Sequence, residues 1–169
     1  MVFPALLTIL AAFLVFVTPG LTKGLDIEGG TLLIVQTEKP VDAVALEQAL
    51  QQSFSLPELK ITATGVGVRI QFKEEPSIAS AQQQLNEARG LLESNPGQAK
   101  QKAVQAIGFL GQWVSPLPNL SNQSPGEALE TASQVLVTAQ EQFERRLQKT
   151  IFSILNLSPE TARFQKREV

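Results

Sequence analysis

The sequence predicts an α+β protein in which one N-terminal transmembrane helix precedes a domain with the element order βαββαβ. Three observations lead to this prediction. Residues 1–22 contain no charged side chain. Residues 31–73 contain short segments whose apolar side chains alternate or recur every fourth position, and residues 76–157 carry long helical stripes rich in Gln, Ala and Leu. This helical section is expected to be an enlarged replacement for the second helix of the domain.

The composition limits the chemistry of the chain. Its 169 residues suit one domain with a short appendage, and 43% hydrophobic with 18% charged residues exclude a disordered chain. The net charge of −2 lacks the basic excess of a nucleic-acid-binding protein. Since the chain contains no Cys and no His, disulfides, zinc sites and Cys or His nucleophiles are excluded. We predict no enzyme activity, no catalytic residue, no metal and no cofactor.

The charge-free segment 1–22 predicts a membrane span, because about 20 apolar residues in a helix match the hydrocarbon thickness of a bilayer. A cleaved signal peptide and a buried core helix are the alternatives. The first fits less well because no basic residue precedes the segment, and the second because core helices rarely run this long without a polar face. The expected division is a transmembrane helix at 1–22 and a domain at 23–169, and the flanking charges do not indicate on which side of the membrane the domain lies.

The next segments predict the elements of the domain in order. Residues 31–37 are expected to form a strand, and residues 41–54 a helix that Asp42 caps. Residues 59–64 predict a second strand, and the alternation at 66–73 predicts a third, joined to the second by a turn at Gly65. The apolar positions of the helix recur every fourth residue, at Leu46, Leu50 and Phe54.

The helical section 76–157 contains apolar seams spaced three and four residues apart. Asn95-Pro96-Gly97 and the loop 115–126 interrupt it, and Ser124 with Glu127 predicts a capping box at the start of its last helix. The last nine residues, 161–169, are expected to form a fourth strand. With that strand, the element order predicts a ferredoxin-like antiparallel sheet.

Two groups of charged residues are interpreted as solvated surface. Glu74 and Glu75 form an adjacent acidic pair in a polar stretch, and Arg145, Arg146 and Lys149 form a basic cluster on a helix. Exposed charge is the usual state of such residues, so neither group predicts catalysis or binding of lipid headgroups.

A glycine-rich stretch between the apolar segment and the first strand is the most distinctive motif. It consists of Gly24, Leu25, Asp26, Ile27, Glu28, Gly29, Gly30 and Thr31. The glycine pair permits a positive φ or a close backbone approach before the strand. The Asp26 carboxylate can accept hydrogen bonds from nearby backbone N–H groups. On its residues alone, the stretch is a turn that leads into a strand. It lacks the spacing of a phosphate-binding loop.

An apolar helix followed by this stretch and a strand resembles the SecD/SecF family of protein-export membrane proteins, more closely SecF. The resemblance covers residues 2–73 and about 161–169, and it is absent from 76–157. It implies that the chain is an N-terminal portion of a longer protein or a truncated reading frame. Six residues carry over as a structural family signature: Gly24, Leu25, Asp26, Gly29, Gly30 and Thr31.

The resemblance also implies a function. Members lie beside the Sec channel and a partner SecD/SecF subunit in the plasma membrane of prokaryotes, where their domains outside the cytoplasm help to move preproteins. The chain is therefore expected to be an accessory subunit of the Sec translocase. The alternative is a membrane-anchored adaptor whose helical section, 76–157, docks a partner protein through its apolar seams.

Overall fold

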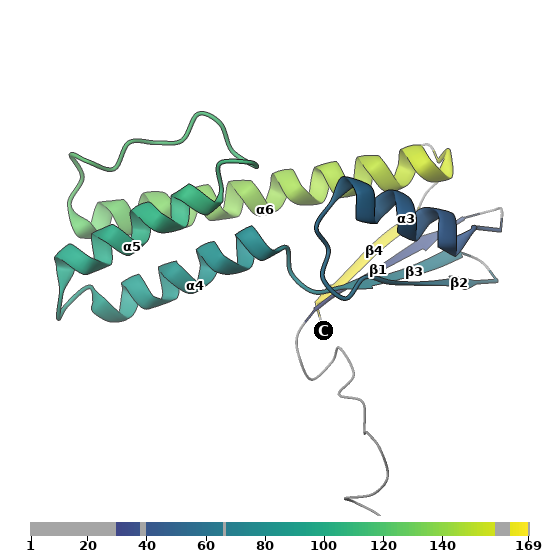
Figure 1. Ribbon diagram of the computed structural model, residues 1–169, viewed down its shortest axis with the longest axis horizontal. Coiled ribbons are helices and arrows are strands. Elements are labelled where there is room, and N and C mark those ends of the chain that lie inside the picture. Colours follow the sequence, from purple (N-terminus) through teal and green to yellow (C-terminus); the bar gives the residue numbers. More distant parts are fainter. Residues whose placement is uncertain (1–29, 38–39, 66, 158–162, 169) are drawn as a thin grey trace, which may run out of the picture.

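The computed structural model describes residues 30–37, 40–65, 67–157 and 163–168. In this part, four strands form one sheet, and a helical section extends beyond it (Figure 1). The elements are, in chain order, β1 (Thr31–Gln36), α3 (Ala43–Ser53), β2 (Lys60–Thr64), β3 (Gly67–Phe72), α4 (Pro76–Leu91), α5 (Pro96–Phe109), α6 (Pro125–Leu155) and β4 (Arg163–Glu168).

The sheet has the strand order β2-β3-β1-β4, and all of its neighbouring strands are antiparallel. β1 is therefore an inner strand, paired with β3 from Thr31↔Phe72 to Gln36↔Gly67 and with β4 from Thr31↔Glu168 to Gln36↔Arg163. The alternation in the sequence explains its buried face, because residues two apart point to the same side. The buried side chains of β1 and β3 are Leu33, Val35, Val68, Ile70 and Phe72.

α3 covers this face with the predicted stripe (Figure 1). The carboxylate of Asp42 accepts hydrogen bonds from the backbone N–H of Val44 at 3.0 Å and of Ala45 at 3.1 Å, which satisfies two of the free donors at the helix start. Leu46 and Leu50 are fully buried. The predicted strand–helix–strand–strand order of residues 31–73 is therefore present.

Each helix of the helical section begins with a capping side chain followed by proline. Glu75, Asn95 and Ser124 are the N-caps, and a proline occupies the first turn after each. Ser124 and Glu127 form the predicted capping box. α4 and α5 pack side by side, and the first half of α6 packs against both, whereas its second half reaches α3 and the sheet (Figure 1).

The apolar seams of the helical section face inward and join the core of the sheet. One continuous buried cluster extends from β1 through α3 to all three later helices. In α6 its members are Ala128, Leu129, Ala132, Val135, Leu136, Ala139, Phe143, Leu147 and Ile151. The seams are therefore used in packing within the chain.

The predicted fold class needs correction in its element order. A ferredoxin-like βαββαβ domain has one helix between the third and fourth strands, whereas α4, α5 and α6 all lie between β3 and β4. The described order is thus βαββαααβ. Proline lacks the N–H that continues a helix, so Pro96 and Pro125 each start a new helix instead of extending the previous one.

The second correction concerns the membrane helix of the predicted fold class. Within residues 30–37, 40–65, 67–157 and 163–168, no helix combines the length and the apolar character that a membrane crossing requires. α6 is long enough, but acidic and basic side chains interrupt it, among them Glu130, Glu141 and Arg145. Residues 1–22, on which the prediction was made, lie outside the described residues.

Candidate functional site

The described end of the glycine-rich signature leads directly into β1, one of the two inner strands of the sheet. Gly30 precedes β1, and Thr31 is its first residue, with Phe72 of β3 on one side and Glu168 of β4 on the other. Gly30 and Thr31 are both half-buried. The other signature residues, Gly24, Leu25, Asp26 and Gly29, lie outside the described residues.

The register brings the two ends of the described chain together. Because β1 and β4 are antiparallel, the start of β1 and the end of β4 lie at the same end of the sheet (Figure 1). The chain therefore enters and leaves the described domain at one end of the sheet, where Gly30 and Thr31 lie.

A small pocket lies against this place. It has a volume of about 70 Å³ and lies between the start of β1 and the second half of α6. Thr31 and Leu33 line it from β1, two residues apart and so on the same face of the strand. The other lining residues are Phe72, Phe143, Glu144, Leu147 and Gln148. Thr31, the last signature residue, thus lines a pocket whose other side is formed by the long helix.

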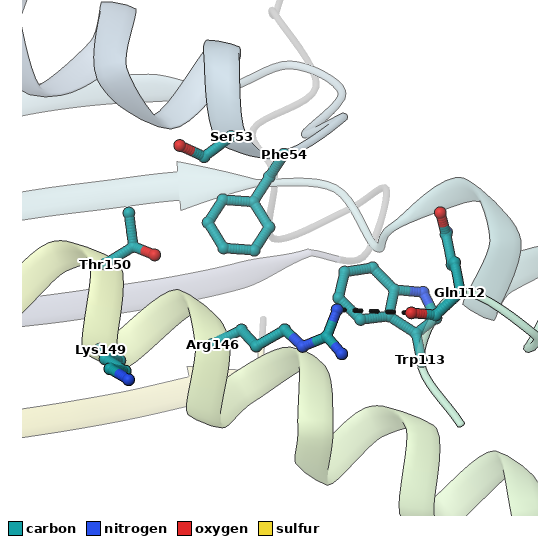
Figure 2. A pocket seen from close by; sticks show the side chains of 7 residues that line it. All are labelled: Ser53, Phe54, Gln112, Trp113, Arg146, Lys149 and Thr150. Carbon is teal, nitrogen blue, oxygen red and sulfur yellow. Dashed lines mark hydrogen bonds between the residues drawn. The ribbon is translucent and has the colours of Figure 1, made fainter. Parts of the chain in front are cut away.

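A larger pocket, of about 360 Å³, opens between the end of α3, the segment after α5, and α6 (Figure 2). We call it the α3–α6 pocket. Its lining residues are Ser53, Phe54, Gln112, Trp113, Arg146, Lys149 and Thr150. Arg146, Lys149 and Thr150 lie on one face of α6 because residues three and four apart are neighbours on a helix.

Aromatic rings fix one wall of the α3–α6 pocket. Phe143 makes edge-on contacts with Phe54, at 6.0 Å between ring centroids, and with Trp113, at 5.3 Å. A third edge-on contact, at 6.3 Å, joins Phe143 to Phe72 of the sheet. Such pairs favour fixed ring orientations, so Phe54 and Trp113 are held in place from behind.

A polar network around the buried Glu75 holds the segment after α5. Ser77 donates its hydroxyl hydrogen to Glu75, and its oxygen accepts from Gln112 Nε2 at 2.8 Å and from Trp113 Nε1 at 3.0 Å. Gln112 Nε2 also lies 3.2 Å from Glu75 Oε1. The Glu75 carboxylate further accepts from the backbone N–H groups of Ser77 and Ile78.

This network corrects the interpretation of the acidic pair. Glu74 is exposed as predicted, but Glu75 is only 4% exposed. A buried carboxylate needs hydrogen bonds or a counterion, and backbone and side-chain donors provide them here. The sequence signal that we missed is the combination of Glu75, Pro76 and Ser77, in which an acidic N-cap precedes proline at the first helical position.

The basic cluster is exposed, as predicted, but its three members differ. Arg145 is paired with Glu141 at 3.7 Å on the same helix. The guanidinium of Arg146 lies 5.4 Å from the ring centroid of Trp113 and donates a hydrogen bond of 3.4 Å to the backbone oxygen of Gln112 (Figure 2). Lys149 lines the same pocket. Arg146 is therefore a pocket residue, which its spacing alone did not reveal.

Neither pocket was predicted from the sequence. The lining residues come from segments that are distant along the chain, and no local motif joins Phe54, Trp113 and Arg146. The described residues contain no group of three or more His, Cys, Asp or Glu side chains arranged to hold a metal ion.

Comparison with known proteins identifies the glycine-rich stretch. A protein-family model described as the SecD/SecF GG motif matches residues 14–41. The match extends from the apolar segment through the signature and β1 to the residue before the Asp42 cap. Neither the search of curated proteins nor the search of solved structures found a significant match.

Proposed function

Residues 14–41 carry the GG motif of the SecD/SecF family, which supports assigning the chain to that family of protein-export components, and we propose that the chain is an accessory subunit of the Sec translocase. In this role it would assist the movement of preproteins across the membrane together with the Sec channel and a partner SecD/SecF subunit. The motif match is the observation that carries the proposal.

The position of the motif supports a structural role for it. The six signature residues precede or begin β1, which pairs with β3 and β4; they are Gly24, Leu25, Asp26, Gly29, Gly30 and Thr31. Thr31 also lines the small pocket against α6. We infer that the signature sets the orientation of the domain relative to the residues before it and takes no part in bond-making chemistry.

The family is membrane-associated, and we propose the plasma membrane of a prokaryote as the location, with the described domain outside the cytoplasm. The entry and exit of the chain at one end of the sheet support this arrangement, because both ends then face the same surface. The division between residues 1–22 and 23–169 stays a prediction. Protease added to intact cells should digest the domain, and complete protection would contradict its proposed side.

No described contact favours the adaptor alternative. That interpretation depended on apolar seams in 76–157 that would be available to a partner. The seam residues Ile78, Ala81, Leu85 and Ala88 of α4 are buried against the other helices, as are the seam residues of α5 and α6. Apolar stripes that are covered within the chain do not provide a docking surface.

A substitution at Gly30 tests the proposed function. A β-branched side chain next to Thr31 should disturb the entry of β1 between Phe72 and Glu168. We expect Gly30→Val, in the full-length protein, to lower export of a reporter preprotein in cells that depend on the variant, while the subunit still accumulates in the membrane.

The matched control is Glu28→Ala, two residues earlier and outside the six signature residues. We expect nearly normal export from this variant. Normal export with Gly30→Val would contradict the proposed role of the signature. Severe loss with Glu28→Ala would indicate a charge-based role in place of a structural one.

A further inference from the structure

The α3–α6 pocket combines charge and aromatic surface in a way that packing within the chain does not require. We propose that it binds a small organic carboxylate whose charged group lies next to an apolar or aromatic body. The inference depends on the described pocket alone and is independent of the proposed role in export.

The charged residues of the pocket are both basic. Arg146 and Lys149 line it, and the other lining side chains are neutral. Within the described part of the chain, neither forms an ion pair with a carboxylate, whereas the adjacent Arg145 does so with Glu141. Both cations thus line an open pocket, and no carboxylate of the described residues forms an ion pair with either of them. This arrangement favours an anionic ligand.

Arg146 is already positioned for such a ligand. Its guanidinium lies over the Trp113 ring and makes one long hydrogen bond, of 3.4 Å, to the Gln112 backbone oxygen. A guanidinium has five N–H donors in a planar fork that matches a carboxylate. The aromatic contact therefore fixes the plane of the group and leaves donors for a carboxylate.

The apolar part of the ligand would lie between Phe54 and Trp113. Both rings are half-buried and both are held by Phe143, and Trp113 is further fixed by its bond to Ser77. Rings held in this way lose little additional freedom when a ligand binds. The volume of about 360 Å³ lies within the usual range of small-molecule pockets.

The hydroxyl groups of Ser53 and Thr150 complete the opposite side of the pocket (Figure 2). Ser53 donates its hydrogen to the Ala49 backbone oxygen at 3.0 Å, so its oxygen is left as an acceptor. A ligand with an N–H group next to its carboxylate, such as an N-acylated amino acid, would match this arrangement of acceptor, cations and rings.

Trp113 gives a direct readout because it is the one tryptophan of the chain. The full chain, kept in solution with a neutral detergent, is titrated with N-acetylphenylalanine while Trp113 fluorescence is followed, and ligand-observed NMR detects binding independently. N-acetylphenylalaninamide, which has the same ring and no charge, is the matched control ligand. We expect the carboxylate to bind about tenfold or more tightly than the amide.

Three variants locate the binding to the pocket. Arg146→Gln and Lys149→Gln should each weaken carboxylate binding several-fold. Arg145→Gln removes the same charge from the neighbouring position, outside the pocket, and should leave binding unchanged. All three positions are exposed, so far-UV circular dichroism should show unchanged folding.

Several results would overturn the proposal. These are equal affinity for the acid and the amide, no binding by either method up to about 10 mM ligand, and a loss with Arg145→Gln as large as that with Arg146→Gln. The last result would show that net charge, and not the pocket, attracts the ligand.

Discussion

At the scale of single residues, Gly67 is the position at which the backbone leaves least freedom. Its φ is +154°, and a Cβ built on it would lie 2.1 Å from the backbone oxygen of Val35 and 2.9 Å from Cα of Gln36. The end of β1 therefore approaches the start of β3 too closely for any side chain at Gly67. The alternating pattern predicted the hairpin and its turn at Gly65, which lies between the end of β2 and the start of β3. It did not reveal the constraint at Gly67, because close approach between two strands leaves no local signal.

We expect Gly67→Ala to destabilise the fold by about 3 kcal/mol, since the added carbon must displace the backbone of β1. Urea unfolding followed by far-UV circular dichroism measures this change. The control is Gly65→Ala in the same hairpin, where an added Cβ meets no atom within 4 Å. Equal stability of the two variants would contradict the close approach.

At the scale of elements, the helix starts are the features that the sequence specifies best. The capping box of α6 is formed by Ser124 and Glu127, with Glu127 Oε2 accepting from the backbone N–H of Ser124 at 2.8 Å and from its hydroxyl at 2.7 Å. These hydrogen bonds lower the pKa of Glu127 below its ordinary value of 4.5. The charged form of Glu127 is therefore the form that stabilises the start of α6.

The lowered pKa of Glu127 makes the stability of the fold depend on pH with a defined sign. A carboxylate whose pKa is lowered on folding contributes stability above its unfolded pKa, and the contribution is lost as the pH falls through its folded pKa. We expect Glu127→Gln to be less stable than the parent at pH 7, with the difference shrinking as the pH falls below about 4.5. Thermal unfolding at a series of pH values measures this. A constant difference would contradict the charge effect.

At the scale of the whole molecule, Phe143 connects the helical section to the sheet. Its ring contacts Phe54 at the end of α3, Phe72 in β3 and Trp113 after α5. Phe143 lies in the half of α6 that reaches the sheet, and α6 continues from there into the packing with α4 and α5 (Figure 1). The two parts should therefore unfold together.

We expect Phe143→Ala to cost about 3–5 kcal/mol, because it removes a buried ring with three aromatic partners. Far-UV circular dichroism and Trp113 fluorescence should shift to the same lower denaturant midpoint. Val137→Ala is the control on the same helix, since Val137 is 56% exposed, and it should change stability by at most about 0.5 kcal/mol. Separate transitions for the two signals would show that the parts unfold independently.

The sequence predicted what depends on local periodicity and missed what depends on tertiary contact. The apolar stripe of α6 recurs at helical spacing, and the Asp42 cap lies directly before the helix that it caps. Both are therefore visible in the sequence alone. Glu75 is hydrogen-bonded to Gln112, far along the sequence, and the guanidinium of Arg146 lies over Trp113. The glycine-rich signature was identified by resemblance, and its residues before Gly30 lie outside the described residues.

The pairing of β1 with β4 also affects how the chain folds during its synthesis. β1 is made first and β4 last among the described elements, with the whole helical section between them. Until β4 has left the ribosome, β1 has only β3 as a neighbour, and its other edge exposes unpaired N–H and C=O groups. The nascent domain therefore passes through a stage with an open sheet edge, at which another extended chain can pair, and completing the sheet closes that edge.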